Sequence, residues 1–162
     1  MAAEPMEFVD ATVFLGMNSS NDALRLSCVA FFAARLDGRL AMSYEQVGRC
    51  DDIIWGYSRE LQDAYYPFMD NLHTDLRFDR LAYDDRDIKV ASMTDGLAAP
   101  ESLLLAMVQN RGGTLVSLNP RLLSLADVPV NPPPLAADAS FSGTLDELYQ
   151  VSLALRVDVS EL

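Results

Sequence analysis

Five residues of this 162-residue chain carry oxygen ligands that a single metal site could use: Asp10, Asp51, Asp52, Glu101 and Asn119. Carboxylate and amide oxygens are the ligands that Mg²⁺ and Mn²⁺ prefer. Two such ions can activate a water molecule and stabilise the leaving oxygen when a phosphodiester is cleaved. If the fold brings these residues together, they predict a divalent-metal site with hydrolytic chemistry.

Asp10 is the most informative of the five because it lies inside the apolar run of residues 8–15. The β-branched and aromatic residues of this run predict a buried strand. Burying an ionised carboxylate without a partner costs several kcal/mol. Asp10 therefore either points out of the end of a sheet or is held by hydrogen bonds or a metal. A structural interpretation is also open, in which Asp10 caps a nearby helix or accepts hydrogen bonds from loop amides.

The other four residues have structural interpretations as well. Asp51 and Asp52 are neighbours in a predicted helix and are typical of a solvated helix face. Glu101 stands at a predicted helix start, where a carboxylate stabilises the positive end of the helix dipole whatever the function. Asn119 precedes Pro120, and this pair is common in turns.

Other polar and aromatic residues point less clearly to chemistry. His73 is the only histidine, so zinc sites and Ser-His-Asp triads are poorly supported, and a surface or interface role is favoured. The acidic run Asp84, Asp85 and Asp87 is typical of a solvated helix start. The aromatic residues between 55 and 68 either pack in the core or form a partner surface or a groove that stacks nucleobases.

The charge balance is strongly acidic, with 24 acidic against 12 basic residues and a net charge of −12. Because nucleic-acid binding depends on Lys and Arg neutralising phosphates, this balance argues against broad attraction to nucleic acid. A nuclease with a local basic strip beside an acidic metal pocket remains compatible with it. A solubilising surface explains the charge equally well.

Cysteine use and hydropathy predict a cytoplasmic protein that does not enter a membrane. Cys28 and Cys50 are too few for a disulfide scaffold and lack CxxC spacing, which favours free or buried thiols. No apolar run approaches the ~18 residues that span a bilayer. The N-terminal residues lack the positive charge and apolar core of a signal peptide.

Strand-like and helix-like segments alternate along the chain. Strands are predicted at 8–15, 40–42, 76–83 and 114–118. Helices are predicted at about 22–36, 44–55, 59–75 with a break or kink at Pro67, 84–97, 101–111 and 144–155. Residues 128–134 are extended because of their prolines, and 155–159 could form an edge strand. This alternation predicts an α/β fold with a mainly parallel sheet, in which sites form outside the carboxyl ends of the strands.

Four segments in order resemble the PIN-domain family of metal-dependent ribonucleases. They read FVDATVFL at 8–15, LAMS at 40–43, PESLLLA at 100–106 and GTLVSLN at 113–119. The resemblance covers roughly residues 7–123. It implies a PIN-like three-layer fold, with a central, mainly parallel sheet flanked by helices, over residues 1–124. Residues 125–162 would be a Pro-rich C-terminal extension that packs on the same domain.

By this resemblance, the chain would be an endoribonuclease that uses Mg²⁺ or Mn²⁺. Asp10, Glu101 and Asn119 would be catalytic and would bind the metal together with Asp51 or Asp52. Thr12 and Ser117 would support them, and a metal-bound water would attack the phosphodiester of RNA.

The sequence also departs from the family pattern, and each departure weakens a metal site. Cys50 stands near the place of the second carboxylate, Glu101 replaces an aspartate, and Asn119 replaces the last aspartate. A second hypothesis is therefore a catalytically degenerate PIN-like scaffold that binds a protein or a small ligand. A homodimer is among the partners that the resemblance implies.

Overall fold

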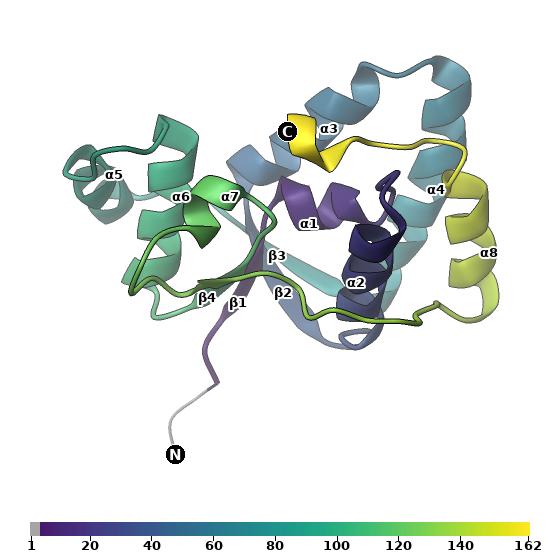
Figure 1. The fold of residues 1–162 in the computed structure, drawn as a ribbon, viewed down its shortest axis with the longest axis horizontal. Coiled ribbons are helices and arrows are strands. Elements are labelled where there is room, and N and C mark those ends of the chain that lie inside the picture. Colours follow the sequence, from purple (N-terminus) through teal and green to yellow (C-terminus); the bar gives the residue numbers. More distant parts are fainter. Residues whose placement is uncertain (1–3) are drawn as a thin grey trace.

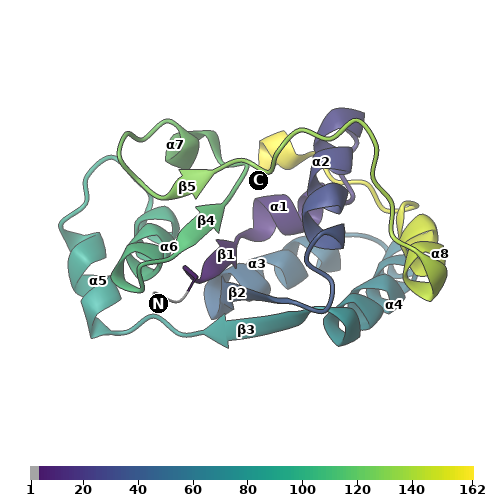
Figure 2. The ribbon, with the colours of Figure 1, turned by 90° about the horizontal axis from the view of Figure 1, so that it is seen from below.

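The computed structural model describes residues 4–162, and a parallel sheet forms the middle of the molecule. The strands lie side by side in the order β3-β2-β1-β4-β5, and every pair is parallel, as Figure 2 shows. Their bounds are Glu7–Val9 for β1, Arg39–Ser43 for β2, Arg77–Leu81 for β3, Thr114–Val116 for β4 and Val130–Asn131 for β5. The predicted α/β class with a parallel sheet is confirmed.

Helices cover both faces of the sheet and give three layers (Figure 1). Helices α5, α6 and α7 lie on one side, and α2, α4 and α8 lie on the other. The helix bounds are Ala11–Gly16 for α1, Asp22–Ala33 for α2, Tyr44–Trp55 for α3, Arg59–Asp75 for α4, Asp85–Ser92 for α5, Ala99–Asn110 for α6, Pro120–Leu123 for α7 and Gly143–Ser152 for α8.

The strand side chains alternate between two hydrophobic cores. Phe8 and Leu115 pack in the core that α6 covers, whereas Val9 and Val116 pack in the core of α1 to α4 and α8. Successive residues of a strand point to opposite faces of the sheet, so β1, β2 and β4 contribute buried residues to both cores, whereas β5 contributes Val130 to one of them. This burial on both sides explains why the strands read as continuous apolar runs.

Helix caps fix two of the predicted helices at the expected residues. The Ser43 hydroxyl accepts a hydrogen bond from the Gln46 N–H at 3.1 Å and starts α3. The Asn21 side chain accepts one from the Leu24 N–H at 3.1 Å and starts α2. Ser and Asn are favoured at this position because their side-chain oxygens satisfy helix N–H groups that lack partners.

Pro67 does not break the fourth helix, so the predicted break is wrong, and the alternative of a kink stays a prediction. Helix α4 runs through it from Arg59 to Asp75, as the apolar periodicity predicts. Tyr65 and Phe68, on either side of the proline, are buried, and Phe68 packs against Tyr149 of α8 with ring centroids 5.1 Å apart. The burial of these large side chains outweighs the one backbone hydrogen bond that a proline removes.

The predicted strand at 8–15 is the main error of the sequence interpretation. Strand β1 ends at Val9, and residues 11–16 form helix α1, because the side chain of Asp10 caps that helix. All residues of α1 are buried, and apart from Thr12 none has a polar side chain, so the sequence carries no helical period. Gly16 lets α1 approach α2 closely, since an added Cβ would lie 2.5 Å from the Cys28 sulfur.

Three smaller predictions also need correction. Helix α5 ends at Ser92 instead of 97, and Gly96, with a φ of 86°, lies in the loop that follows. Asn119 caps the short helix α7 instead of forming only a turn. Residues 155–159 make a single bridge between Val157 and Ser19 instead of an edge strand, and a 3₁₀ helix follows at Val159–Glu161.

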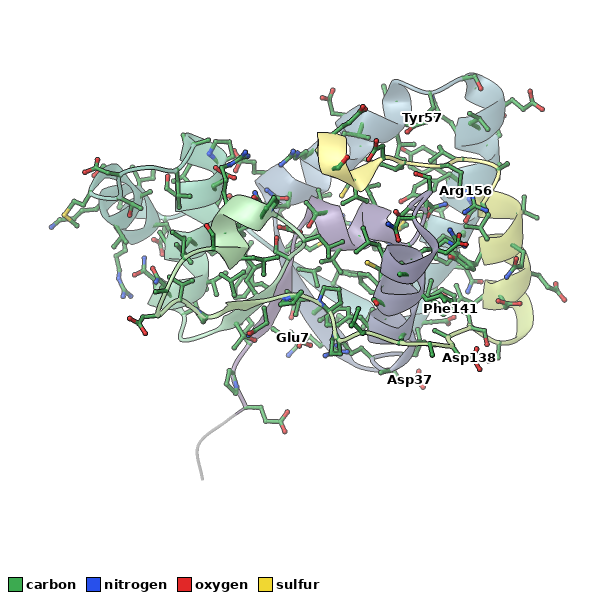
Figure 3. All side chains as sticks on the ribbon, in the orientation of Figure 1. Glu7, Asp37, Tyr57, Asp138, Phe141 and Arg156 are labelled. Carbon is green, nitrogen blue, oxygen red and sulfur yellow. The ribbon has the colours of Figure 1, made fainter. Side chains whose placement is uncertain are left out.

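Residues 125–162 contribute to the same sheet and cores as the rest of the chain. Strand β5 pairs with β4, and helix α8 packs on α4. The Tyr149 hydroxyl donates to the Met17 carbonyl at 2.7 Å, and that of Tyr57 donates to the Arg156 carbonyl at 2.9 Å (Figure 3). Among the helices of residues 4–162, none combines the length and apolar character that crossing a membrane requires.

Candidate functional site

Asp10 lies at the junction of β1 and α1 and is 3% exposed. One carboxylate oxygen accepts hydrogen bonds from the Thr12 N–H at 3.1 Å, the Thr12 hydroxyl at 2.6 Å and the Val13 N–H at 3.4 Å. The other oxygen accepts a hydrogen bond from the Ser117 hydroxyl. Both oxygens of Asp10 are thus engaged by donors of the chain itself.

Thr12 and Ser117 also connect the ends of strands β1 and β4. The Thr12 hydroxyl oxygen accepts from the Leu118 N–H at 2.8 Å, and the Ser117 hydroxyl oxygen accepts from the Asn119 N–H at 3.0 Å. Asp10 is therefore the centre of a network that holds the carboxyl ends of two neighbouring strands together. Burial raises the pKa of Asp10 above its ordinary value, although the hydrogen bonds from Ser117 and Thr12 act in the opposite direction.

Glu101 lies in the first turn of α6 and is 6% exposed. Its Oε1 accepts a hydrogen bond from the Ala98 N–H at 3.0 Å, just before the helix. Its Oε2 accepts from Asn119 Nδ2 at 2.6 Å and from Arg121 Nε at 2.7 Å. Burial raises the pKa of Glu101, but the hydrogen bonds from Asn119 and Ala98 and the charge of Arg121 outweigh it, so the net shift is downward.

Asn119 uses both ends of its amide inside this site. Its Nδ2 donates to Glu101, and its Oδ1 accepts from the Arg121 N–H at 3.0 Å as the cap of α7. The amide oxygen, which would have to ligate a metal, is therefore engaged by the backbone. Arg121 is a site residue that sequence reasoning missed. The only feature of the sequence that could have indicated this role is the position of Arg121, a cationic residue two positions after Asn119.

The neighbours Asp51 and Asp52 of α3 are both exposed and face different hollows of the surface. Asp52 borders a hollow of about 510 Å³ together with Glu101 and Arg121. Asp51 borders a separate cavity, and its carboxylate accepts a hydrogen bond from the Tyr66 hydroxyl at 3.1 Å. Asp52, and not Asp51, thus borders the same hollow as Glu101.

The donor set does not fit a divalent ion in this arrangement. Within residues 4–162, no three His, Cys, Asp or Glu side chains are grouped closely enough to hold a metal. Arg121 already places a positive charge on Glu101, and donors surround Asp10. Cys50 is buried, and burial raises the pKa of its thiol well above the ordinary value, so it does not replace the missing carboxylate.

A comparison with family models matches the whole chain, residues 1–162, to a family of unknown function, DUF6190. The chain belongs to DUF6190. No curated protein matches it. The role of this DUF6190 chain must therefore be judged from its own geometry.

The DUF6190 chain has a second place where polar groups and a cavity meet. A cavity of about 290 Å³ lies between α3, α4, β2 and β3, and Asp51, Asp70, His73 and Arg80 border it. His73 is also part of the packing around this cavity, because its ring lies 4.7 Å from that of Phe78, centroid to centroid. The sequence interpretation of His73 as a surface residue missed this cavity.

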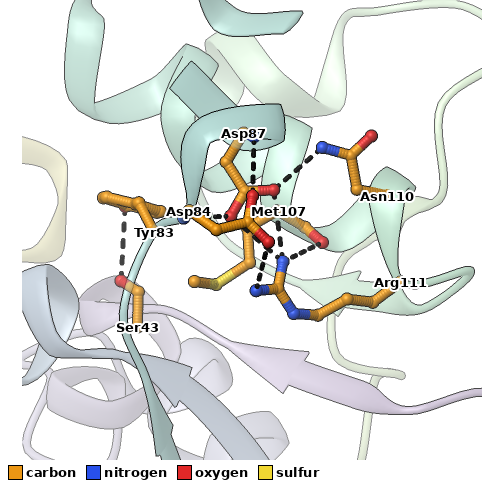
Figure 4. A network of polar contacts seen from close by, with 7 residues as sticks. All are labelled: Ser43, Tyr83, Asp84, Asp87, Met107, Asn110 and Arg111. Atoms are coloured by element: carbon orange, nitrogen blue, oxygen red, sulfur yellow. Dashed lines mark hydrogen bonds and ion pairs between the residues drawn. The ribbon is translucent and has the colours of Figure 1, made fainter. Parts of the chain in front are cut away.

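The acidic run at α5 forms a structural network instead of a purely solvated helix start (Figure 4). Asp87 is fully buried, and its carboxylate accepts from the Asp84 N–H at 3.0 Å, from Asn110 Nδ2 at 2.8 Å and from Arg111 Nη1 at 3.1 Å. This network ties α5 to α6. The expectation of a solvated carboxylate is wrong for Asp87, although Asp84 and Asp85 are exposed.

Proposed function

We propose that this DUF6190 chain is a PIN-like scaffold that binds a ligand and does not cleave RNA. The observation that carries the proposal is the pairing of Glu101, whose Oε2 lies 2.6 Å from Asn119 Nδ2 and 2.7 Å from Arg121 Nε. A guanidinium and an amide thus take up the carboxylate that a divalent ion would need. The cation that neutralises Glu101 belongs to the chain itself.

The state of Asp10 supports the same proposal. A divalent ion that displaced the Ser117 hydroxyl from Asp10 would break a hydrogen bond that joins β1 to β4, and one that displaced the Thr12 hydroxyl would break a bond at the start of α1. Breaking such buried charge-assisted hydrogen bonds costs about 1.5–3 kcal/mol each. Displacement of the Ser117 hydroxyl would therefore disturb the end of the sheet that positions the site.

An endoribonuclease remains the competing prediction, because Asp10 and Glu101 both connect to Asn119. Asp10 does so through the Ser117 hydroxyl, and Glu101 does so directly. The three residues therefore belong to one network at the carboxyl ends of β1 and β4. A rearrangement of Arg121 would be required before an ion could join them.

A cleavage assay separates the two functions. Labelled single-stranded RNA is incubated with the full chain and Mn²⁺, alongside Asp10→Asn. We expect no cleavage above the level of the variant. Cleavage that depends on Mn²⁺ and is lost in Asp10→Asn would overturn the proposal and support the nuclease.

A melting-temperature titration with Mn²⁺ tests the metal site independently, since an ion bound only by the folded state must stabilise it. We expect no shift for the wild type at millimolar Mn²⁺. The double variant Asn119→Asp, Arg121→Gln restores a carboxylate and removes the competing cation. A shift that appears only in this variant would support a degenerate PIN-like site. If the double variant folds but does not respond, its residues are not arranged as a metal site, and the PIN-like part of the proposal fails.

A further inference from the structure

We propose that the cavity between α3, α4, β2 and β3 binds a small zwitterion of the amino-acid type with an apolar side chain. This inference rests on the proposed binding function and names its ligand class. The cavity is distinct from the Asp10 network, since neither Asp10 nor Glu101 borders it.

The floor of the cavity is apolar and buried. Phe14, Met42 and Met69 border it with exposed fractions of 4%, 2% and 7%. Tyr66 and Val47 border it as well and are half-buried. With a volume of about 290 Å³, the cavity is at the small end of the range for ligand pockets. It therefore suits a ligand of the size of a single amino acid, with its side chain on the apolar floor.

The rim of the cavity carries one cation and one anion that have no ion-pair partner among residues 4–162. Arg80 of β3 and Asp70 of α4 are both exposed and border the cavity. Within residues 4–162, neither has an ion pair within 4.0 Å. The acidic neighbour of Arg80, Asp79, is engaged by Arg39 at 2.8 Å and Arg77 at 3.1 Å.

The charges of Arg80 and Asp70 determine which charges a ligand of this cavity should carry. The guanidinium of Arg80 matches a carboxylate, because its N–H groups can bind both oxygens together. Asp70 matches an ammonium, and Asp51 adds a second negative charge on the same rim. A ligand with only a negative charge would be repelled by both aspartates, and a ligand with only a positive charge would be repelled by Arg80. A zwitterion satisfies all three.

Calorimetric titration of the full chain with four probes tests the charge pattern. L-Phenylalanine carries both charges, L-phenylalaninamide lacks the carboxylate, 3-phenylpropionate lacks the ammonium, and glycine lacks the apolar side chain. We expect L-phenylalanine to bind and each of the others to bind at least about tenfold more weakly, because each loses one charged or apolar contact. No binding of L-phenylalanine, or equal binding of the amide, would overturn the inference.

Two exposed substitutions assign the charges. Arg80→Gln is expected to weaken the binding of L-phenylalanine about tenfold and to strengthen that of phenylalaninamide, because the amide has no carboxylate for Arg80 to bind and its ammonium is repelled by Arg80. Asp70→Asn is expected to weaken the binding of L-phenylalanine and to strengthen that of 3-phenylpropionate, because that anion has no ammonium for Asp70 to bind and is repelled by it. Arg86→Gln and Asp95→Asn, at exposed positions that do not border the cavity, are matched controls. If both rim variants bind like their controls, the assignment is wrong.

A filled cavity provides a test that does not depend on charge. Val47→Trp places a large side chain in the cavity wall and is expected to abolish binding while circular dichroism shows a folded chain. Unchanged binding in this variant would show that the ligand binds outside this cavity. RNA cleavage is measured separately. Cleavage with intact titrations would overturn only the proposed function, whereas failed titrations without cleavage would overturn only the ligand assignment.

Discussion

Glu101 and Asp87 occupy the same position in two consecutive helices, each as the third residue of its helix. Each accepts a hydrogen bond at 3.0 Å from the N–H of the residue just before the helix. Each also accepts from an asparagine side chain and pairs with an arginine: Asn110 and Arg111 for Asp87, Asn119 and Arg121 for Glu101. The sequence marked Glu101 as catalytic and Asp87 as a solvated surface residue, yet their contacts are of the same kind.

The two sites differ in how deeply their ion pairs are buried. The side chains of Asp87 and Arg111 are 0% and 23% exposed, whereas those of Glu101 and Arg121 are 7% and 63% exposed. Asp84 completes the cap of α5 with its own carboxylate, and Ala98 has no oxygen to do so at α6. The shared geometry shows that a helix start alone explains such contacts. Only at Glu101 is the paired arginine, Arg121, exposed enough to be replaced by another partner.

The substitution with the largest expected effect is Asp87→Ala. It leaves Asn110, Arg111 and the Asp84 N–H without their buried acceptor, and we expect the free energy of unfolding to fall by about 3 kcal/mol. Urea unfolding measures this loss. Asp85→Ala is the matched control, because Asp85 is exposed in the same helix turn. A loss for Asp87→Ala no larger than that of the control would refute the structural role of this network.

Glu101→Gln is expected to cost less, about 1 kcal/mol, because water can replace the contact with the exposed Arg121. A double-mutant cycle with Arg121→Gln isolates the pair. We expect a coupling below about 1 kcal/mol. Glu60→Gln, in the exposed first turn of α4, is the control. A cost as large as that of Asp87→Ala would contradict the difference in burial between the two sites.

The fold was largely predictable, because long elements carry strong local signals. Helices α3 and α4 begin and end at the predicted residues, and Ser43 and Gly56 mark the two ends of α3. Errors fall on short buried elements. An apolar run that is buried on all sides has no period, so residues 11–16 read as a continued strand and not as helix α1.

The grouping of Asp10, Glu101 and Asn119 was predictable from the sequence, but the hydrogen-bond and ion-pair partners of these residues were not. Asp10, Glu101 and Asn119 do lie in one network, as expected for residues near the carboxyl ends of parallel strands. Which partner neutralises Glu101 depends on contacts between separate elements, and Arg121 carries no local signal for that role. The cavity at Asp70 and Arg80 was missed for the same reason, since it combines residues from α4 and β3.

Acid should weaken the two arginine-paired carboxylates together. Hydrogen bonds and arginine charges outweigh burial and lower the pKa values of Asp87 and Glu101 in the folded chain. Their stabilising contribution is therefore present above the unfolded pKa, about 4, and is lost as pH falls through the folded values. We expect the stability difference between the wild type and Asp87→Asn to shrink from pH 7 to pH 3 in urea unfolding. A constant difference would contradict these shifts.

Asp10→Asn should have the smallest effect, because two changes oppose each other. Burial raises the pKa of Asp10, so its charge costs stability as pH rises through the folded value, and asparagine removes that cost. Asparagine also keeps an oxygen that accepts from the Thr12 and Val13 N–H groups, since it is as good a cap as aspartate. The amide N–H₂ can also donate to the Ser117 oxygen, whose hydroxyl donates to the carboxylate in the wild type. We therefore expect a change in the free energy of unfolding within about 0.5 kcal/mol at pH 7, whereas Asp10→Ala, which leaves Thr12 and Ser117 without this acceptor, loses about 3 kcal/mol.

The pH dependence of Asp10→Asn makes the comparison with Asp87 sharper. Because the wild type regains stability when Asp10 is protonated, any advantage of the variant should vanish as pH falls, and the shift runs opposite to that expected for Asp87. A loss above about 2 kcal/mol at pH 7 would mean that the negative charge itself stabilises the fold. If the melting temperature of the wild type then also rose with Mn²⁺ and that of Asp10→Asn did not, the stabilisation would be assigned to a cation at Asp10, which would contradict the proposal that the chain binds no metal there.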